Sequence, residues 1–438
     1  MRGGSTAGGS ERTPRVLVLG GGFGGLQCAR KLARKPVEVL LVDRNNYHLF
    51  TPLLYQVASS LLNPSEISFP LRHILRGGRN VRVRRAEVAR IDLGARRATT
   101  AEGHVFEYDW LVVATGAGTN FYGLESVERA SFGLKDLPDG MALRNHVLDC
   151  FEAALLETDR EARRSWLTFL VVGGGPTGVE YAGALCELFR LVLPADFPDL
   201  DVRASRVVLV EALDRLLFEF PPELGEYTKK ALEQRGVEVR LGTRVTGVEG
   251  DSAVVLADGG VLPSRTLIWA AGVRPISPAT EPPLPRTRQG RIEVDVDLRV
   301  RGQERVFAIG DAAAMLQNGK PLAMMAPQAM QAGRHVAAQI LRAVQGRPLE
   351  PFRYRDKGVM ATIGRSAGVA AVGPLRFKGF VGWLAWLVVH LYFLIGFRNR
   401  LIVLSRWSYN YFRLDRPIRL IASSAPSKRR RTVSSSSP

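Results

Sequence analysis

Two glycine-rich segments of this sequence have the residue types and spacing that bind phosphate groups. Gly20–Gly25 follows the apolar run Val16–Leu19, and Gly173–Gly178 follows Phe169–Val172, 153 residues further along the chain. Both segments read G-x-G-x-x-G. In this pattern the first glycine permits a tight turn, the second lets the backbone approach a pyrophosphate, and the third lets the next helix pack closely. Because the helix N-terminus also offers free N–H groups to phosphates, the chain is predicted to bind two dinucleotides.

An acidic residue follows each glycine loop at the end of the next expected strand. Asp43 follows Val37–Val42, and Glu211 follows Val207–Val210. A carboxylate at this position accepts hydrogen bonds from a ribose hydroxyl group and repels a 2′-phosphate. We therefore expect NADH rather than NADPH at the second loop. The alternative, a solvated acid at a strand end, is less favoured because both acids occur in the same context.

A third acid, Asp311, follows the expected strand Val306–Ile309 and the glycine Gly310. Ligands of open α/β sheets bind at the carboxyl ends of the strands, which makes Asp311 a candidate ligand-binding residue. Asp is also a favoured N-cap for a helix starting at Ala312, and both roles can hold together.

The elements that must position these residues follow the same plan twice. In the first copy, a strand over Arg15–Gly20, a helix over Gly24–Lys35 and a strand over Val37–Val42 are followed by Trp110–Gly116, an apolar strand that ends in a tight glycine turn. In the second copy the corresponding elements are expected over Phe169–Val172, Gly178–Arg190, Val207–Val210 and Leu267–Gly272. Apolar strands that alternate with helices indicate parallel sheets. The predicted fold class is α/β, with two Rossmann-like dinucleotide-binding domains, one inserted in the other, plus a C-terminal helical membrane-attachment region.

The expected domain organisation comprises seven consecutive ranges. They are a disordered N-terminal extension (1–14), the first part of an FAD-binding domain (15–120), a connecting segment (121–164), an NADH-binding domain (165–285), the second part of the FAD-binding domain (286–346), a C-terminal membrane-associated region (347–420) and a disordered basic and Ser-rich tail (421–438). The first residues lack the apolar stretch of a signal peptide.

The composition narrows the class of protein. Of the net charge of +18, residues 376–438 contribute +11, from twelve Lys or Arg and one acid, so the excess belongs to the C-terminal end. No nucleic-acid-binding module signature is present, and no nucleic-acid partner is expected. Cys28, Cys150 and Cys186 form no spaced pair and are expected to be buried free thiols. No metal site is expected.

An uncharged run of 19 residues, Gly379–Phe397, marks the C-terminal region. As a helix it would be roughly 28 Å long, close to the thickness of a bilayer core. A single span would place the basic tail across the membrane, against the positive-inside tendency, so monotopic attachment to an anionic lipid surface is favoured. A span remains the less favoured alternative. His390 is either a core histidine or a polar group facing a quinone, and the first interpretation is favoured.

The sequence resembles the type II NADH dehydrogenases, which are single-subunit NADH:quinone oxidoreductases of the two-dinucleotide flavoprotein superfamily. The glycine motifs alone indicate only the superfamily. The narrower resemblance covers residues from about 15 to 415 and rests on the following segments: 46–58 (NYHLFTPLLYQVA), 114–116 (ATG), 173–180 (GGGPTGVE), 269–273 (WAAGV), 307–311 (FAIGD), 326–331 (APQAMQ), 352–358 (FRYRDKG) and 361–364 (ATIG).

The resemblance implies the following site residues. FAD would be bound by Gly20, Gly22, Phe23, Gly24, Gly25, Asp43, Arg44, Val88, Thr115, Gly116, Gly310, Asp311, Ala326 and Pro327. NADH would be bound by Gly173, Gly175, Pro176, Thr177, Gly178, Glu180, Glu211, Ala271 and Gly272. Glu180 and Gln331 would be the catalytic residues beside the nicotinamide and the quinone. Glu180 could instead be an acid that stabilises a helix N-terminus. Pro327 departs from the family, because many members have a glutamine there.

The resemblance further implies a non-proton-pumping NADH:quinone oxidoreductase on the cytoplasmic face of the cell membrane, with hydride passing from NADH to FAD and two electrons to a membrane quinone. A homodimer through the C-terminal region is also expected. Two alternatives remain: a low-turnover membrane redox sensor that binds NADH and FAD, and an NADH oxidase or ferredoxin-type reductase on the same fold. Without a spaced cysteine pair, a disulfide relay beside the flavin is not expected.

Overall fold

The computed structural model describes residues 12–413, 415–416 and 418–422. The disorder predicted for the N-terminal extension and for the tail concerns residues 1–11 and 423–438, which lie outside the described residues. The chain forms two compact units, each made of three segments. The first unit comprises Met1–His48, Phe69–Gly118 and Arg274–Asp356, and the second comprises Leu49–Ser68, Thr119–Val273 and Lys357–Pro438. These units group the chain more coarsely than the seven predicted ranges, which remain a prediction.

The first unit contains a parallel five-stranded sheet in the order β22-β9-β1-β2-β5. The strands are β1 (Arg15–Leu19), β2 (Glu38–Asp43), β5 (Val81–Arg85), β9 (Trp110–Val113) and β22 (Val306–Ala308). The central strands are almost wholly buried, which explains their continuous apolar runs. Helix α1 (Phe23–Leu32) packs so closely on α10 (Ala326–Val344) that a Cβ on Gly333 would lie 2.1 Å from the carbonyl oxygen of Gly24.

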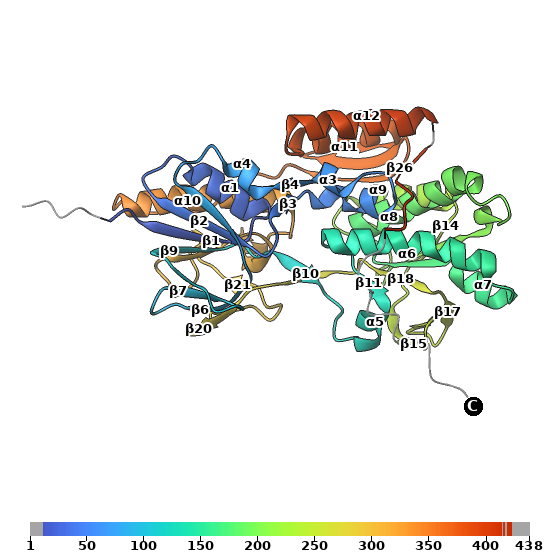
Figure 1. Ribbon diagram of the computed structural model, residues 1–438, viewed down its shortest axis with the longest axis horizontal. Helices are drawn as coiled ribbons and strands as arrows, with labels where there is room; N and C mark the ends of the chain where they lie inside the picture. Colours follow the sequence, from blue (N-terminus) through green and yellow to red (C-terminus); the bar gives the residue numbers. More distant parts are fainter. Residues whose placement is uncertain (1–11, 414, 417, 423–438) are drawn as a thin grey trace, which may run out of the picture. The chain divides into compact units, whose positions relative to one another are not determined.

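A second, four-stranded sheet of the first unit has the order β20-β6-β7-β8. Its strands are β20 (Ala279–Glu281), β6 (Val88–Asp92), β7 (Arg97–Thr100) and β8 (Val105–Glu107). The short helix α4 (Leu71–Leu75) precedes β5. In Figure 1 the first unit carries the labels β1, β2, β9, α1 and α10.

The second unit repeats the parallel plan in the strand order β11-β18-β12-β13-β14. These strands are β11 (Ser131–Phe132), β12 (Thr168–Val172), β13 (Arg206–Val210), β14 (Val237–Arg240) and β18 (Thr266–Trp269). Its helices include α5 (Glu125–Ala130), α6 (Leu137–Leu156), α7 (Arg160–Trp166), α8 (Pro176–Glu187) and α9 (Pro222–Gln234). An antiparallel sheet of β15 (Val245–Glu249), β16 (Ala253–Leu256) and β17 (Val261–Pro263) completes this part.

The C-terminal segment packs on the same unit. It forms an antiparallel sheet of β26 (Val359–Gly364), β27 (Ala367–Val372) and β28 (Leu375–Lys378), followed by α11 (Gly379–Phe393) and α12 (Phe397–Arg413). Helices α11 and α12 run side by side (Figure 1). Glycines permit the close contacts, since a Cβ on Gly183 would lie 2.0 Å from the carbonyl oxygen of Ile363, and one on Gly382 would lie 2.4 Å from that of Gly368.

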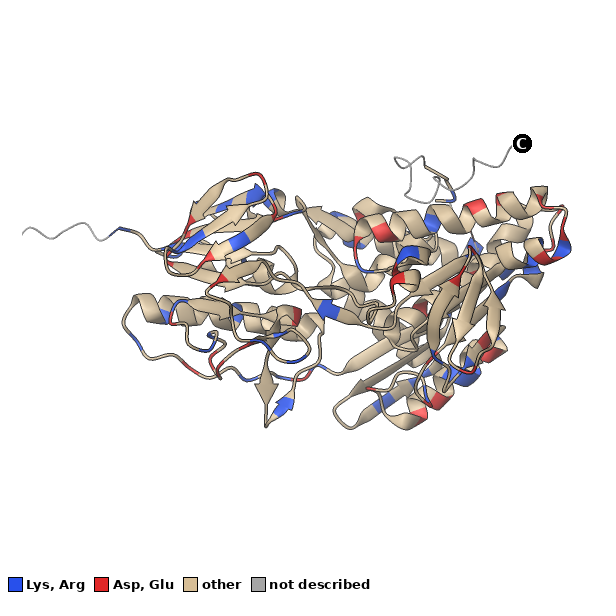
Figure 2. Ribbon diagram, turned by 90° about the horizontal axis from the view of Figure 1, so that it is seen from below, with Lys and Arg blue, Asp and Glu red and all other residues tan. Residues whose placement is uncertain are grey.

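Helices α2 (Leu54–Ala58) and α3 (Pro64–Ile67) also belong to the second unit. The parallel sheets and the two C-terminal helices confirm the predicted α/β fold class. Within the part of the chain that the structure describes, no helix is long and apolar enough to cross a membrane. Figure 2 shows Lys and Arg positions interspersed with Asp and Glu positions on helices, strands and loops.

Candidate active site

The first glycine loop has the backbone geometry that its sequence predicts. Gly20 has φ +103°, and a Cβ there would lie 2.3 Å from the carbonyl oxygen of Ala114. A Cβ on Gly25 would lie 1.9 Å from the carbonyl oxygen of Gly20, so the start of α1 can approach the strand only without a side chain. In contrast, a Cβ on Gly22 would meet no atom within 4 Å. The second glycine therefore faces open space, where a pyrophosphate can approach the backbone.

The second loop has the same geometry in the second unit. Gly173 has φ +113°, and a Cβ on Gly178 would lie 1.8 Å from the carbonyl oxygen of Gly173. A Cβ on Gly175 would again meet nothing within 4 Å. The two loops thus share one construction, in which the outer glycines are required by the protein and the middle glycine is not.

Asp43 and Glu211, the acids at two strand ends, each accept a hydrogen bond from the backbone of the neighbouring glycine loop. Oδ2 of Asp43 accepts a hydrogen bond of 2.6 Å from the backbone N–H of Gly21, and Oδ1 accepts one of 2.6 Å from Asn45. In the second unit, Oε2 of Glu211 accepts a bond of 2.5 Å from the N–H of Gly174, and Oε1 accepts one from Leu213. Each carboxylate therefore lies beside its glycine loop, where it can also accept a bond from a ribose hydroxyl group.

The helix ends at both loops lack side-chain caps. The N-cap residues are Gly22 for α1 and Gly175 for α8, and neither can supply a side-chain acceptor to the N–H groups of the first turn. Pro176 occupies the first turn of α8, where the missing N–H is not needed, and Thr177 beside it is exposed. Free N–H groups next to open space fit the phosphates of a dinucleotide. The residues of both loops therefore fit the two cofactors expected for them.

The remaining residues predicted for FAD lie at strand ends, in turns and at a helix start of the first unit. Gly116 (φ +72°) and Gly310 (φ +67°) follow β9 and β22, and the hydroxyl group of Thr115 donates to the carbonyl oxygen of Ile276. The others are Phe23 and Gly24 in α1, Arg44 after β2, Val88 in β6, Asp311 in a single 3₁₀ turn, and Ala326 and Pro327 in the first turn of α10. Their roles toward FAD remain predictions.

The side chain of Gln331 is already engaged. Its Nε2 donates to the carbonyl oxygen of Arg355 at 2.9 Å, and its Oε1 accepts from the N–H of the same residue at 3.0 Å. These two bonds connect the backbone of Arg355 to helix α10 within the first unit. Its predicted contact with the nicotinamide or quinone remains a prediction. Pro327 starts α10 without an N–H donor, as prolines do in a first turn.

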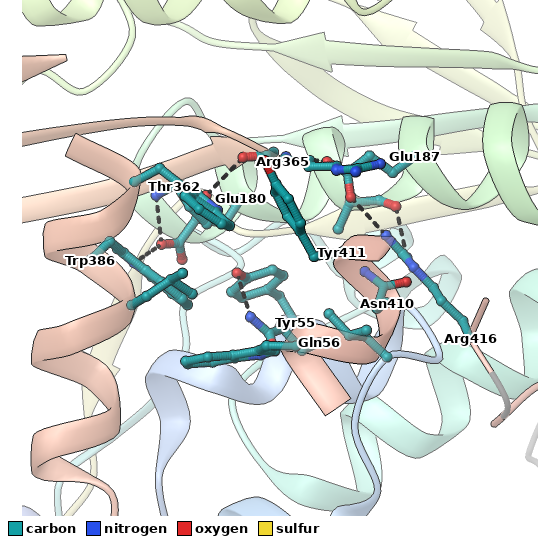
Figure 3. A pocket seen from close by; sticks show the side chains of 16 residues that line it. Tyr55, Gln56, Glu180, Glu187, Thr362, Arg365, Trp386, Asn410, Tyr411 and Arg416 are labelled. Atoms are coloured by element: carbon teal, nitrogen blue, oxygen red, sulfur yellow. Dashed lines mark hydrogen bonds and ion pairs between the residues drawn. The ribbon is translucent and has the colours of Figure 1, made fainter. Parts of the chain in front are cut away.

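A pocket in the second unit contains the other predicted catalytic residue, Glu180 (Figure 3). Its cavity volume is about 70 Å³. The lining comes from α2, α8, β26, α11, α12 and the segment after α12. The lining residues are Tyr55, Gln56, Leu61, Glu180, Ala184, Glu187, Thr362, Gly364, Arg365, Trp383, Trp386, Leu387, Trp407, Asn410, Tyr411 and Arg416.

Glu180 is buried in the second turn of α8, the helix whose N-terminus forms the second glycine loop. Its Oε1 accepts a bond of 2.9 Å from the indole Nε1 of Trp386 and one of 3.3 Å from the N–H of Thr362. Burial nevertheless raises the pKa of Glu180 to about 8, because these two bonds only partly offset the loss of water around the carboxylate. At pH 7 the group is therefore mostly protonated and holds a proton inside the pocket.

His390 lies one helical turn after Trp386 in α11. Its ring stacks on the Trp386 indole with 4.0 Å between the ring centroids, and its Nδ1 is 2.7 Å from the carbonyl oxygen of Trp386. Burial lowers the pKa of His390 to about 4, so the ring is neutral at pH 7, and its Nδ1–H donates to that carbonyl. These contacts favour the interpretation as a packed histidine over that of a proton donor.

The aromatic side chains of Tyr55 and Trp407 also line the pocket. Trp407 of α12 donates from Nε1 to Oε1 of Gln56 at 2.8 Å, and Nε2 of Gln56 donates to the hydroxyl oxygen of Tyr55 at 2.9 Å. Burial raises the pKa of Tyr55 well above its ordinary value, so its hydroxyl group stays protonated. Tyr55 is thus a second group in this pocket that keeps a proton at pH 7.

Sequence reasoning did not assign roles to Tyr55, Gln56, Trp386 and Trp407. Tyr55 and Gln56 lie inside the stretch that supported the family resemblance, which was the available signal. No local pattern indicates that Trp386 meets a residue 206 positions earlier.

The sequence predicted that the three cysteines are buried free thiols, and it predicted no metal site. Cys28, Cys150 and Cys186 are free and buried, and burial raises the pKa of Cys28 and of Cys186 to about 12. Among the described residues, no group of His, Cys, Asp and Glu side chains could hold a metal ion.

The sequence has extensive similarity to known proteins. Residues 14–333 match the family described as pyridine nucleotide-disulphide oxidoreductase. The type II NADH:quinone oxidoreductase Ndh of Mycobacterium tuberculosis is 39% identical over 416 residues, covering 91% of this chain and 88% of that protein. The type II NADH:quinone oxidoreductase of Staphylococcus aureus is 32% identical over 366 residues, covering 82% of this chain and 89% of that protein.

Solved structures show the same fold at lower sequence identity. NDH2 from Plasmodium falciparum in complex with NADH matches with a TM-score of 0.84 at 20% identity, covering 92% of this chain and 99% of that chain. The sulfide:quinone oxidoreductase of Aquifex aeolicus matches with a TM-score of 0.69 at 18% identity, covering 91% of this chain and 95% of that chain. With relatives this similar over most of its length, the chain belongs to the pyridine nucleotide-disulphide oxidoreductase family and, within it, to the type II NADH:quinone oxidoreductases.

Proposed function

We propose that this protein is a membrane-associated, non-proton-pumping NADH:quinone oxidoreductase. The observation that carries the proposal is that helix α8 contributes to two sites. The N-terminus of this helix has the geometry of a dinucleotide-binding loop, and its second turn places the protonated Glu180 in an aromatic pocket. A loop that fits a dinucleotide and a buried carboxyl group that can supply a proton therefore lie on the same helix.

FAD, when bound, supplies the hydride and electron chemistry that links NADH to quinone. The first glycine loop with Asp43 would hold its pyrophosphate and ribose, and the second loop with Glu211 would hold NADH. The carboxylate of Glu211 favours a free ribose 2′-hydroxyl group over a 2′-phosphate, which selects NADH.

The pocket residues manage protons and exclude water. Reduction of a quinone to a quinol requires two electrons and two protons, and Glu180 can donate one of these protons to a quinone oxygen. Its carboxylate would then be held by Trp386 and Thr362, which already bond to Oε1. The hydroxyl group of Tyr55 is a candidate donor to the same substrate.

The C-terminal helices supply the lipid contact in this proposal. Both α11 and α12 expose large apolar side chains, namely Phe380, Val381, Leu384, Val388, Tyr392, Phe393, Phe397, Leu401, Leu404, Tyr409 and Phe412. Exposed arginines accompany them in α12, such as Arg398 and Arg413. Apolar side chains flanked by cations are typical of helices that lie in the interface of an anionic bilayer.

We place this contact on the cytoplasmic face of the cell membrane, where NADH is available. A homodimer through the C-terminal region stays a prediction, which sedimentation velocity in detergent would test.

The proposal is tested with the purified, FAD-loaded protein. NADH should bleach the flavin absorbance, and a short-chain quinone should restore it in repeated cycles. Bleaching without quinone-dependent recovery would contradict the assignment of quinone as the acceptor, and recovery with oxygen alone would favour an NADH oxidase.

A redox sensor is the second candidate, and Pro327 is the observation that favours it. Pro327 offers no side-chain amide in the first turn of α10, where the resemblance to the type II NADH dehydrogenases implies a glutamine. Steady-state turnover with quinone separates the two functions, because a sensor would complete few cycles.

A further inference from the structure

A fully buried arginine from the segment after α12 lines the pocket. Arg416 is 1% exposed, although arginine is rarely buried so completely. It follows the last residue of α12, Arg413, by three positions and reaches into the core of the second unit. Figure 3 shows its side chain beside Glu187, on the opposite side of the pocket from Trp386.

The guanidinium group joins two different walls of the pocket. Nη1 donates to the carbonyl oxygen of Ser59 at 2.9 Å and to that of Ala184 at 3.0 Å. Ser59 is the C-cap of α2, which carries Tyr55 and Gln56. Ala184 lies one helical turn after Glu180 in α8. The two walls that hold the proton-bearing groups of the pocket are therefore tied by one side chain.

The carboxylate of Glu187 on α8 is the third acceptor of the Arg416 guanidinium group. Nη2 of Arg416 donates to Oε2 of Glu187 at 3.0 Å, while Oε1 of Glu187 accepts from the backbone N–H of Arg365. Arg365 follows β26, the strand that provides Thr362 to Glu180. The Arg416–Glu187 pair thus extends the connection to a third wall.

The chemistry of arginine suits this role. Its planar guanidinium group offers five N–H donors in fixed directions, so it can bond to two carbonyl oxygens and a carboxylate together. A lysine carries a single ammonium group on a flexible stem and cannot reproduce this geometry.

We propose that Arg416 is a positioning residue for the quinone reaction, which fixes α2 against α8 so that Tyr55 and Glu180 face the substrate together. This inference rests on the proposed function, because it assumes that quinone enters the pocket. Arg416 does not touch the glycine loop of α8, so its effect should be confined to the quinone half of the cycle.

The test separates the two half-reactions in the FAD-loaded enzyme. Arg416→Met is compared with the unaltered protein in stopped-flow measurements, first of flavin bleaching by NADH and then of flavin recovery with a short-chain quinone. We expect NADH bleaching to be unchanged and the rate of flavin recovery with quinone to fall roughly tenfold, since small misplacements of reacting groups slow a reaction by this order or more. Arg416→Lys should recover part of the loss.

Two further variants distinguish positioning from simpler effects. Arg206→Met removes an ion pair with Glu238 elsewhere in the second unit, and Arg206 does not line the pocket. Glu187→Gln combined with Arg416→Met removes both charges, so no carboxylate is left unpaired in the core and the variant is more certain to fold.

The inference is supported if Arg416→Met and the double variant both slow flavin recovery with quinone and Arg206→Met does not. It is overturned if Arg416→Met has no effect, if Arg206→Met has an equal effect, or if the double variant restores the original rate. Failure of the unaltered enzyme to reduce quinone would instead contradict the proposed function itself.

Discussion

Trp386 donates its indole N–H to Oε1 of Glu180 over 2.9 Å, although the two residues are 206 positions apart in the chain. The bond stabilises the charged form of a carboxyl group that burial keeps mostly neutral. Because burial and this bond act in opposite directions, the carboxyl group of Glu180 can release and regain a proton near pH 8.

Glu180→Gln should slow the reduction of quinone. A glutamine can still accept the bonds from Trp386 and Thr362, but it carries no transferable proton. General acids contribute roughly a hundredfold or more, so we expect kcat with quinone to fall by about that factor. In the unaltered enzyme, kcat/KM for quinone should decline as the pH rises through about 8, the pKa of Glu180, because the donor is then ionised. A decline that persists in Glu180→Gln would assign this limb to another group.

Trp386→Phe should move that decline to higher pH. The variant removes the indole donor, which lowers the pKa of Glu180, and leaves burial, which raises it. The carboxyl group would then remain protonated over a wider range. The pH profile of the quinone half-reaction measures this directly, with Trp383→Phe as a control on another aromatic residue of the lining that makes no hydrogen bond to Glu180. A shift in the opposite direction would contradict the arrangement.

His390 should make the protein less stable in mild acid. Burial lowers its pKa from an ordinary value of 6.5 to about 4, so between these pH values the unfolded chain binds more protons than the folded one. The stability that depends on neutral His390 is complete above pH 6.5 and is lost as the pH falls toward 4. His390→Phe should therefore narrow the difference in Tm between pH 7.5 and pH 5. Quinone turnover should change less than about threefold, and a larger loss would favour a catalytic role.

Gly175→Ala should weaken NADH binding without affecting the fold. An added Cβ meets no protein atom within 4 Å, so only a bound pyrophosphate would encounter it. We expect the KM for NADH to rise roughly tenfold, equivalent to about 1.4 kcal/mol, with an unchanged Tm.

Gly178→Ala provides the contrast, because its Cβ would lie 1.8 Å from the carbonyl oxygen of Gly173. Overpacking of this kind costs about 1–3 kcal/mol, and the Tm should fall. Equal behaviour of the two variants would contradict the division of roles within the loop.

Val388→Glu combined with Tyr392→Glu should release the protein from anionic vesicles. These side chains of α11 are 60% and 69% exposed, and burying each in lipid stabilises attachment by about 1.5 kcal/mol or more. The partition coefficient should therefore fall by about a hundredfold in a flotation assay. Leu156→Glu, at an 85% exposed leucine of α6, is the matched control. Undiminished flotation of the double variant would show that another surface binds the lipid.

The dinucleotide loops could be predicted because their geometry is local. Gly20, Gly25 and Asp43 lie within 24 residues, and each has a steric or hydrogen-bonding reason that any such loop shares. The burial of Trp407 could not be predicted in this way. Leu401, Leu404 and Trp407 all lie in α12, yet the two leucines are exposed while Trp407 is buried and bonds to Gln56.

Long-range polar contacts explain most of what the sequence did not indicate. Arg416 reads as one cation of a basic tail, and only the fold shows that it meets Glu187, 229 positions earlier. The uncharged run Gly379–Phe397 is divided by the end of α11 at Phe393 and the start of α12 at Phe397. Periodicity could not show this break, because a run that is apolar on every side carries no directional signal.

The burial of the cysteines has a consequence for the durability of the enzyme. Reduced flavins generate hydrogen peroxide when they meet oxygen, and peroxide reacts with thiolates rather than with thiols. The thiols of Cys28 and Cys186 have a pKa of about 12 and stay protonated at pH 7, and Cys150 is fully buried. The protein should therefore tolerate the oxidant that its own cofactor produces without self-inactivation through its thiols.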